Sequence, residues 1–164
     1  MKTLLKSYQA LITGETNFIA TLANTAAFIY QNIPDLNWAG FYFLDTAHPL
    51  KTTQQLVLGP FQGKIACTRI PVGQGVCGSS FLKQETIIVA DVHQFDGHIA
   101  CDSASNSEIV VPLYKNNQLI GVLDVDSPLF NRFGRDEALF FEAITQILNY
   151  HFDALNQNEG IRSH

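Results

Sequence analysis

The sequence predicts an α+β domain in which helices from both ends of the chain cover one face of a single, mostly antiparallel sheet. Apolar residues recur at intervals of three and four near both ends, as they do in amphipathic helices. Between the ends, short apolar segments alternate with turns, and the sequence KNN joins one pair of segments as it would in an antiparallel hairpin. The other face of the sheet is left to loops, beneath which a ligand pocket can form.

Helices are predicted over 16–32 and 136–155. The first segment carries an apolar stripe and further apolar residues beside it, so this helix is expected to contact two neighbours. The second helix is expected to begin near a capping sequence at 134–136. The stripes consist of Phe18, Ile19, Leu22, Ala26 and Ile29 in the first helix, and of Leu139, Phe140, Ile144, Ile147 and Leu148 in the second.

Segments rich in β-branched and aromatic residues predict the strands. The first two are separated by DTAHPLKTTQ and indicate a hairpin with a long loop, and the last two form the hairpin joined by KNN. The stretch GQGVCGSSFLKQ predicts a short helix with a glycine-rich start. The predicted strands are 38–44, 55–61, 67–72, 85–91, 108–114 and 118–127.

Length and composition fit one domain over residues 1–164, with a core of about 16–155. Lys and Arg total 10, against 15 for Asp and Glu, and the formal charge is −5. The basic residues are scattered, so no nucleic-acid partner is expected. The first residues lack the features of a signal peptide, and no apolar run is long enough to cross a membrane. The expected compartment is the cytoplasm, with no membrane partner.

Three cysteines are candidates for redox chemistry. Cys101 lies in a polar stretch, with His98 three residues before it and Asp102 directly after it. Nine residues separate Cys67 from Cys77 and 23 separate Cys77 from Cys101, which fits neither a zinc site nor a CxxC pair. In the cytosol such cysteines are more often free or catalytic than structural. Each could also be a small core hydrophobe, and the spacing leaves both interpretations open.

Carboxyl and aromatic side chains on the predicted strands could line one pocket. Asp124 and Asp126 share a face because they are two residues apart, and hairpin pairing can bring Glu108 near them. Trp38 and Tyr42 are four apart on the first strand and also share a face. The alternatives are that the two aspartates mark a solvated strand end and that the aromatic residues belong to an ordinary core.

Other polar motifs give weaker signals. The run VGQGVCG lacks the lysine of a phosphate-binding loop, although its amides, like those of 98–105, could bind a carboxylate. His93 and His98 have no matching third ligand, so no metal is expected.

Four blocks of the sequence resemble the GAF domain family and, within it, the free methionine-(R)-sulfoxide reductases: NWAGFY, LGPFQGKIACTRIPVGQGVCG, DVHQFDGHIACDSASNSEIVVPL and IGVLDVDS. The three cysteines within the two long blocks are the most specific part. The resemblance implies a single GAF-like domain that reduces free L-methionine-(R)-sulfoxide and not sulfoxides within proteins. It implies that Cys101 is the nucleophile, Cys67 the resolving cysteine and Cys77 an accessory thiol. It further implies thioredoxin as the external reductant, no metal or organic cofactor, and a homodimer.

The residues suit this chemistry. A thiolate can attack a sulfoxide sulfur, and a second thiol must then condense with the cysteine sulfenic acid that results. Crowded carboxyls raise one another's pKa, so one of Glu108, Asp124 and Asp126 could protonate the departing oxygen while another binds the substrate ammonium. Trp38 and Tyr42 would receive the methyl group on sulfur. The alternative functions are a GAF module that binds a small ligand and a thiol redox sensor without turnover.

Overall fold

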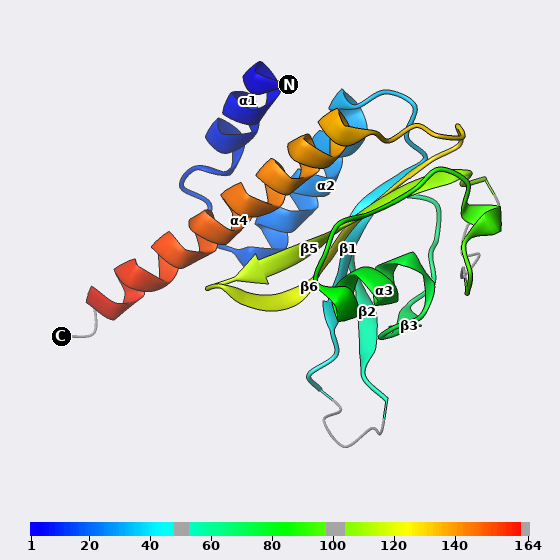
Figure 1. Cartoon of the computed structure of the whole chain (residues 1–164). Helices are drawn as coiled ribbons and strands as arrows, with labels where there is room; N and C mark the ends of the chain where they lie inside the picture. Colours follow the sequence, from blue (N-terminus) through cyan, green and yellow to red (C-terminus); the bar gives the residue numbers. More distant parts are fainter. Residues whose placement is uncertain (48–52, 98–103, 162–164) are drawn as a thin grey trace.

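The computed structural model describes residues 1–47, 53–97 and 104–161, with the side chains described as far as residue 157 (Figure 1). In chain order the elements are α1 (Lys2–Ile12), α2 (Phe18–Asn32), β1 (Trp38–Leu44), β2 (Gln55–Gly63), β3 (Arg69–Pro71), α3 (Gly75–Lys83), β4 (Ile87–Val89), the 3₁₀ helix η1 (Val92–Gln94), β5 (Ser107–Lys115), β6 (Gln118–Ser127) and α4 (Arg135–Ile161).

The described strands form one sheet in the order β3-β2-β1-β6-β5-β4, and every neighbouring pair is antiparallel. The hairpin between β5 and β6 closes through Asn116 and Asn117, both of which have a positive φ. Asparagine tolerates this left-handed conformation better than most residues, which explains why KNN makes a tight turn. Strands β1 and β6 lie at the centre of the sheet, so both of their edges are paired.

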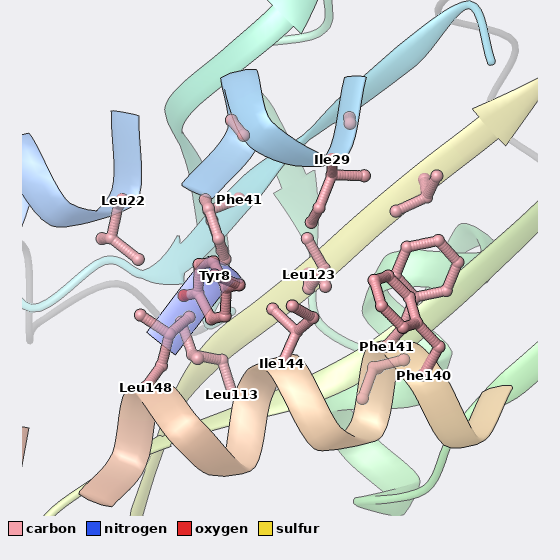
Figure 2. Packing of buried hydrophobic residues seen from close by; sticks show 14 of the residues in the cluster. Tyr8, Leu22, Ile29, Phe41, Leu113, Leu123, Phe140, Phe141, Ile144 and Leu148 are labelled. Atoms are coloured by element: carbon pink, nitrogen blue, oxygen red, sulfur yellow. The ribbon is translucent and has the colours of Figure 1, made fainter. Parts of the chain in front are cut away.

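Helices α2 and α4 cover one face of the sheet, and α1 packs against both of them (Figure 1). Phe41 and Leu123 from the sheet meet Ile29 from α2 and Ile144 from α4 in a core of buried apolar side chains (Figure 2). Tyr8 of α1 is fully buried there, and its hydroxyl shares a 2.9 Å hydrogen bond with the Thr25 hydroxyl. We call this side the helical face.

The opposite side of the sheet carries α3 and a second buried cluster, and we call it the α3 face (Figure 1). Tyr42, Val110 and Val122 from the sheet pack there with Val76 and Phe81 of α3. Close packing of α3 depends on a glycine, because a Cβ at Gly78 would lie 2.4 Å from the carbonyl oxygen of Pro71. The α3 face is therefore apolar around its helix, and its polar side chains are concentrated on β5 and β6.

The predicted fold class is confirmed, with an antiparallel sheet and helices from both ends of the chain on one face. Two edge strands are shorter than predicted, since β3 and β4 pair on one side only. Cys67 consequently lies in the connection before β3 and not in a strand. Helix α2 begins two residues later than predicted because the Asn17 side chain accepts a hydrogen bond from the Ala20 amide and caps it.

Helix α1 was not predicted, and its burial extends the core before residue 16. The signal was present in Leu4, Leu5, Tyr8 and Ile12, which repeat at helical spacing, and all four belong to the core of the helical face or pack against it. Among the described residues, no helix combines the length and apolarity that a membrane span requires.

Candidate functional site

The register of the sheet brings the predicted carboxyls together. Glu108 of β5 pairs with Asp126 of β6, and Asp126 pairs with Trp38 of β1. One step along, Asp124 pairs with Gly40. Since residues two apart on a strand share a face, these side chains all lie on the α3 face.

Glu108 and Asp124 form a buried pair, each with only 6% of its surface exposed. A hydrogen bond joins the two carboxyls. Burial, followed by the charges of Asp124 and Asp126, raises the pKa of Glu108 well above its usual value. Burial also raises the pKa of Asp124 to about 6, although its hydrogen bond with Glu108 favours the ionised form. Both shifts favour retention of a proton by the pair, and their hydrogen bond places that proton on Glu108, because it raises the pKa of Glu108 and lowers that of Asp124.

The main cause of the raised pKa values of Glu108 and Asp124 differs from the one expected from the sequence. Repulsion among the carboxyls was the expected cause, whereas desolvation is the larger one. Asp126 is only half-buried, so it lies at the more open side of the cluster.

Cys77 of α3 completes the buried part of the cluster. Its thiol is free and 3% exposed, and its Sγ atom donates a long hydrogen bond, at 4.0 Å, to Oε1 of Glu108. Burial and the nearby charges of Asp124 and Glu108 raise the pKa of this thiol well above its usual value. Cys77 is therefore a protonated thiol and a poor nucleophile in this conformation.

The aromatic side chains form a wall next to the carboxyls. The rings of Trp38 and Tyr42 stack with centroids 5.9 Å apart, and the ring of Phe61 of β2 also stacks with Trp38, at 5.2 Å. Gly40 makes room for this arrangement, because a Cβ there would lie 2.7 Å from the indole ring and 2.3 Å from Cβ of Phe61. Phe61 was not predicted as a site residue; its signal is its place in the block LGPFQG.

Trp38 and Tyr42 of β1 also hold the chain between β2 and β3. The indole N–H of Trp38 donates to the carbonyl oxygen of Lys64 at 3.1 Å, and the Tyr42 hydroxyl donates to the carbonyl oxygen of Cys67 at 2.8 Å. Cys67 itself is half-buried, and it is disulfide-bonded in this structure, so the hydrogen bond from Tyr42 is seen in the oxidised form. The structure thus brings Cys67 to the edge of the wall formed by Trp38 and Tyr42.

Cys101, with His98 and Asp102, lies outside the described residues. The described residues on either side of it are attached to the site. The carbonyl oxygen of Gly97 accepts a hydrogen bond from the amide of Gly75 at the start of α3, at 3.1 Å. On the other side, the Asn37 side chain, next to Trp38, donates to Oγ of Ser105 at 3.0 Å.

Cys77, Glu108 and Asp124 are also the described side chains that could hold a metal ion, since their ligand atoms all lie within 4.8 Å of one another. Metal ligands must be deprotonated, and the pKa of each of the three is raised, so binding an ion there would require the release of protons. The arrangement therefore suits holding a proton better than holding a cation. A separate cavity of about 220 Å³ lies between α1 and α4 and is lined by none of the predicted site residues that the structure describes; its lining includes Gln9, Tyr150 and His151.

Known proteins share the sequence and the fold of this chain. The GAF domain model matches residues 14–151. The free methionine-R-sulfoxide reductase of Escherichia coli K12 is 54% identical over 145 residues, which cover 88% of this chain and 84% of that protein. The enzyme of the same name from Saccharomyces cerevisiae is 40% identical, with coverage of 91% and 83%. The structure of free methionine-R-sulfoxide reductase from Neisseria meningitidis in complex with its substrate aligns with a TM-score of 0.87 and 43% identity, covering 96% of this chain and 90% of that one.

Proposed function

The chain belongs to the GAF domain family, and we propose from this premise that it reduces free L-methionine-(R)-sulfoxide to L-methionine by thiol chemistry. It is an oxidoreductase whose relatives in Escherichia coli and Saccharomyces cerevisiae are named for this reaction. The observation that carries the proposal is the buried Glu108–Asp124 pair, which keeps a proton beside an aromatic wall.

The proposed chemistry begins at Cys101. Its thiolate attacks the sulfoxide sulfur and forms a sulfur–sulfur bond, while the sulfoxide oxygen takes a proton from Glu108. The resulting hydroxyl then moves from the substrate sulfur to the Cys101 sulfur as the sulfur–sulfur bond breaks, which releases methionine and leaves Cys101 as a sulfenic acid. The Cys67 thiol then displaces this oxygen as water and forms a disulfide. Thioredoxin, a dithiol of the cytoplasm, accepts the disulfide and restores both thiols. Cys77 does not take part in this exchange; it donates to Glu108 and helps to hold that carboxyl in place.

The carboxyls and the aromatic wall divide the substrate between them. Asp124 is ionised at neutral pH and Asp126 is the more exposed of the pair on β6, so these two side chains are placed to bind the substrate ammonium. The wall of Trp38, Tyr42 and Phe61 receives the methyl group, and an aromatic face favours positive charge developing at sulfur. A site that binds both ends of an amino acid rejects a peptide-bound methionine sulfoxide, whose ends are blocked.

We further propose a homodimer in which the outer surfaces of α2 and α4 form the interface. These surfaces expose large apolar side chains, with Ile19 65%, Tyr150 64% and Leu139 55% exposed. Large apolar side chains exposed on helices whose other side packs against the sheet could be buried against a second copy of the chain. Light scattering at micromolar concentration should give twice the monomer mass, and the monomer mass alone would contradict the proposal.

The decisive experiment couples NADPH oxidation to thioredoxin reductase and thioredoxin. Free methionine-R-sulfoxide should be consumed, whereas the S epimer and a peptide-bound sulfoxide should not. Equal turnover of free and peptide-bound substrate would overturn the proposed substrate. Binding without turnover would instead favour a sensor module, and disulfide formation independent of substrate would favour a redox sensor.

Variants of the cysteines separate the chemical steps. Cys101→Ser should release no methionine, even in a single turnover, because the nucleophile is gone. Cys67→Ser should release about one equivalent and then stop as a sulfenic acid. Multiple turnover by Cys101→Ser, measured as methionine formed per protein, would refute the assignment of the nucleophile.

A further inference from the structure

We propose that Trp38 and Tyr42 act as a clamp that fixes Cys67 for disulfide formation, so that the Tyr42 hydroxyl is a positioning group for the resolving step. The inference rests on the proposed function, which makes Cys67 the thiol that condenses with the sulfenic acid of Cys101. It assigns to the two aromatic side chains a second task beyond lining the substrate pocket.

The clamp has two points of attachment on one short segment. Residues 64–68 connect β2 to β3 without belonging to either strand. Trp38 binds the carbonyl oxygen at Lys64 and Tyr42 binds the carbonyl oxygen at Cys67, three residues further on. The next carbonyl oxygen, that of Thr68, accepts from the amide of Leu58 in β2 at 3.1 Å. Removing the Tyr42 hydroxyl would leave the chain fixed at Lys64 and Thr68 and would release the carbonyl of Cys67 itself.

The donors of the clamp are rigid because they belong to the centre of the sheet. Strand β1 is paired on both sides, with β2 and with β6. The Tyr42 ring is buried and stacks on Trp38, which itself stacks on Phe61. Burial, followed by the nearby charges, of which that of Asp124 is the largest, raises the pKa of Tyr42, so the phenol stays a hydrogen-bond donor. Strand β1 therefore holds the Cys67 backbone through Tyr42 and is paired with β6, which carries Asp124 and Asp126.

The position of the Cys67 backbone affects disulfide formation, because a thiol must reach bonding distance and the correct angle before it can attack a sulfenic acid. A buried hydrogen bond that contributes about 0.5–1.5 kcal/mol sets the balance between clamped and released conformations. Losing it should lower the rate of disulfide formation by about two- to ten-fold. The phenyl ring of Tyr42→Phe keeps the stacking contact, so this variant removes the hydroxyl and nothing else.

The chain offers a matched control. Tyr8 is the other fully buried tyrosine among the described residues, and its hydroxyl also makes one hydrogen bond, to Thr25 on the helical face. Tyr8→Phe removes the same atoms from a comparable environment on the other side of the sheet. A purely structural effect of losing a buried hydroxyl should appear equally in both variants.

The test generates the sulfenic acid without substrate. Reduced wild type, Tyr42→Phe and Tyr8→Phe are each treated with hydrogen peroxide, which transfers one oxygen atom to the Cys101 thiolate and leaves as hydroxide. Condensation with Cys67 then releases one water. The Cys67–Cys101 disulfide is quantified over time by peptide mass spectrometry, and the surviving sulfenic acid is trapped with a cyclic diketone. Tyr42→Phe should form the disulfide about two- to ten-fold more slowly and give more trapped product, while Tyr8→Phe should follow the wild type.

Three results would overturn the clamp: equal rates in wild type and Tyr42→Phe, equal slowing in both variants, or no Cys67–Cys101 disulfide in the wild type. A parallel measurement of methionine released from free methionine-R-sulfoxide tests the proposed function separately. No release of methionine together with slow disulfide formation in Tyr42→Phe would refute the reductase and support the clamp. Methionine release with equal disulfide rates would support the reductase and refute the clamp.

Discussion

The two faces of the sheet differ in chemistry although the same strands build both. On β6, Leu123 and Val125 enter the core of the helical face, whereas Asp124 between them lies beside Glu108 on the α3 face. On β5, Ile109 faces the helices and its neighbour Glu108 faces the site. Because side chains alternate along a strand, every second residue of these segments packs in the core of the helical face, and residues between them contribute to the candidate site. Neighbouring substitutions should therefore have separable effects.

The energetics of the two faces also differ. Full burial of a large apolar side chain on the helical face stabilises the fold by about 1.5–3 kcal/mol. Burying an ionised carboxylate on the α3 face is unfavourable, and the Glu108–Asp124 pair responds by retaining a proton. The property that makes the pair costly to bury is the one that supports its proposed role as a proton donor.

The largest difference between the two faces is expected for substitutions of two adjacent residues of β5. Glu108→Gln should slow sulfenic acid formation by about 10²–10⁴-fold, because the proposed general acid is lost while the volume of the side chain is kept. Ile109→Val should instead reduce the free energy of unfolding by about 0.5–1.5 kcal/mol and leave the rate unchanged. Rapid-quench measurement of methionine in a single turnover, with urea unfolding of each variant, checks both. A folded Glu108→Gln that reacts at the wild-type rate would show that the proton comes from elsewhere.

Truncation in the core of the helical face should have the next largest effect. Leu123→Ala should reduce the free energy of unfolding by about 2–5 kcal/mol, because Leu123 is fully buried between the sheet and the helices. The control is Leu82→Ala, which truncates a leucine of α3 that is mostly exposed and should change stability by no more than about 0.5 kcal/mol. Equal losses in urea unfolding would mean that burial does not distinguish the two positions.

The carboxyls predict a pH dependence of stability with a definite sign. The pKa of Asp124 is about 6 in the folded protein and 3.8 in an ordinary environment. Its contribution to stability is therefore complete below about pH 4 and is lost as the pH rises through 6, by up to about 3 kcal/mol. The raised pKa of Glu108 adds a loss of the same sign at higher pH.

Asp124→Asn should flatten this decline in the free energy of unfolding between pH 4 and 7. Asp96→Asn provides the control, because Asp96 is exposed and lies outside the carboxyl cluster. Chemical unfolding at half-unit pH steps measures both slopes. A slope that becomes steeper in Asp124→Asn would mean that the ionised aspartate stabilises the fold, contrary to its burial next to Glu108.

Much of the fold follows from local patterns, since alternation and helical spacing identify elements without knowledge of their partners. The hairpin of β5 and β6, and with it the pairing of Glu108 with Asp126, could be predicted from KNN and two flanking strands. Helix α1 escaped prediction because its stripe is short and its burial depends on contacts with α2 and α4. Such contacts are not written in the local sequence.

The site divides in the same way. The positions of Asp124 and Asp126 on one face follow from the period of a strand, but burial as the main cause of the raised pKa values depends on α3 covering the pair. The roles of Phe61 and Gly40 could not be predicted without the pairing of β1 with β2, in which Gly40 lies opposite Phe61. The hydrogen bond from Tyr42 to Cys67 joins residues 25 apart in the chain, and no local sequence motif predicts it.

The smallest expected effect lies at the start of α2, on the helical face and far from the chemistry. The Asn17 side chain accepts a hydrogen bond from the amide of Ala20 at 2.9 Å, which satisfies one of the unpaired amides of the first turn. Asn17→Ala should therefore reduce the free energy of unfolding by about 1 kcal/mol, while Asn17→Asp, which keeps a capping oxygen, should restore most of it. Reduction of free methionine-R-sulfoxide should be unchanged in both variants, because α2 contacts the sheet from the side opposite Glu108. A loss of stability in Asn17→Asp as large as in Asn17→Ala would show that the cap contributes nothing. A loss of activity without a loss of stability would show that the two faces are coupled.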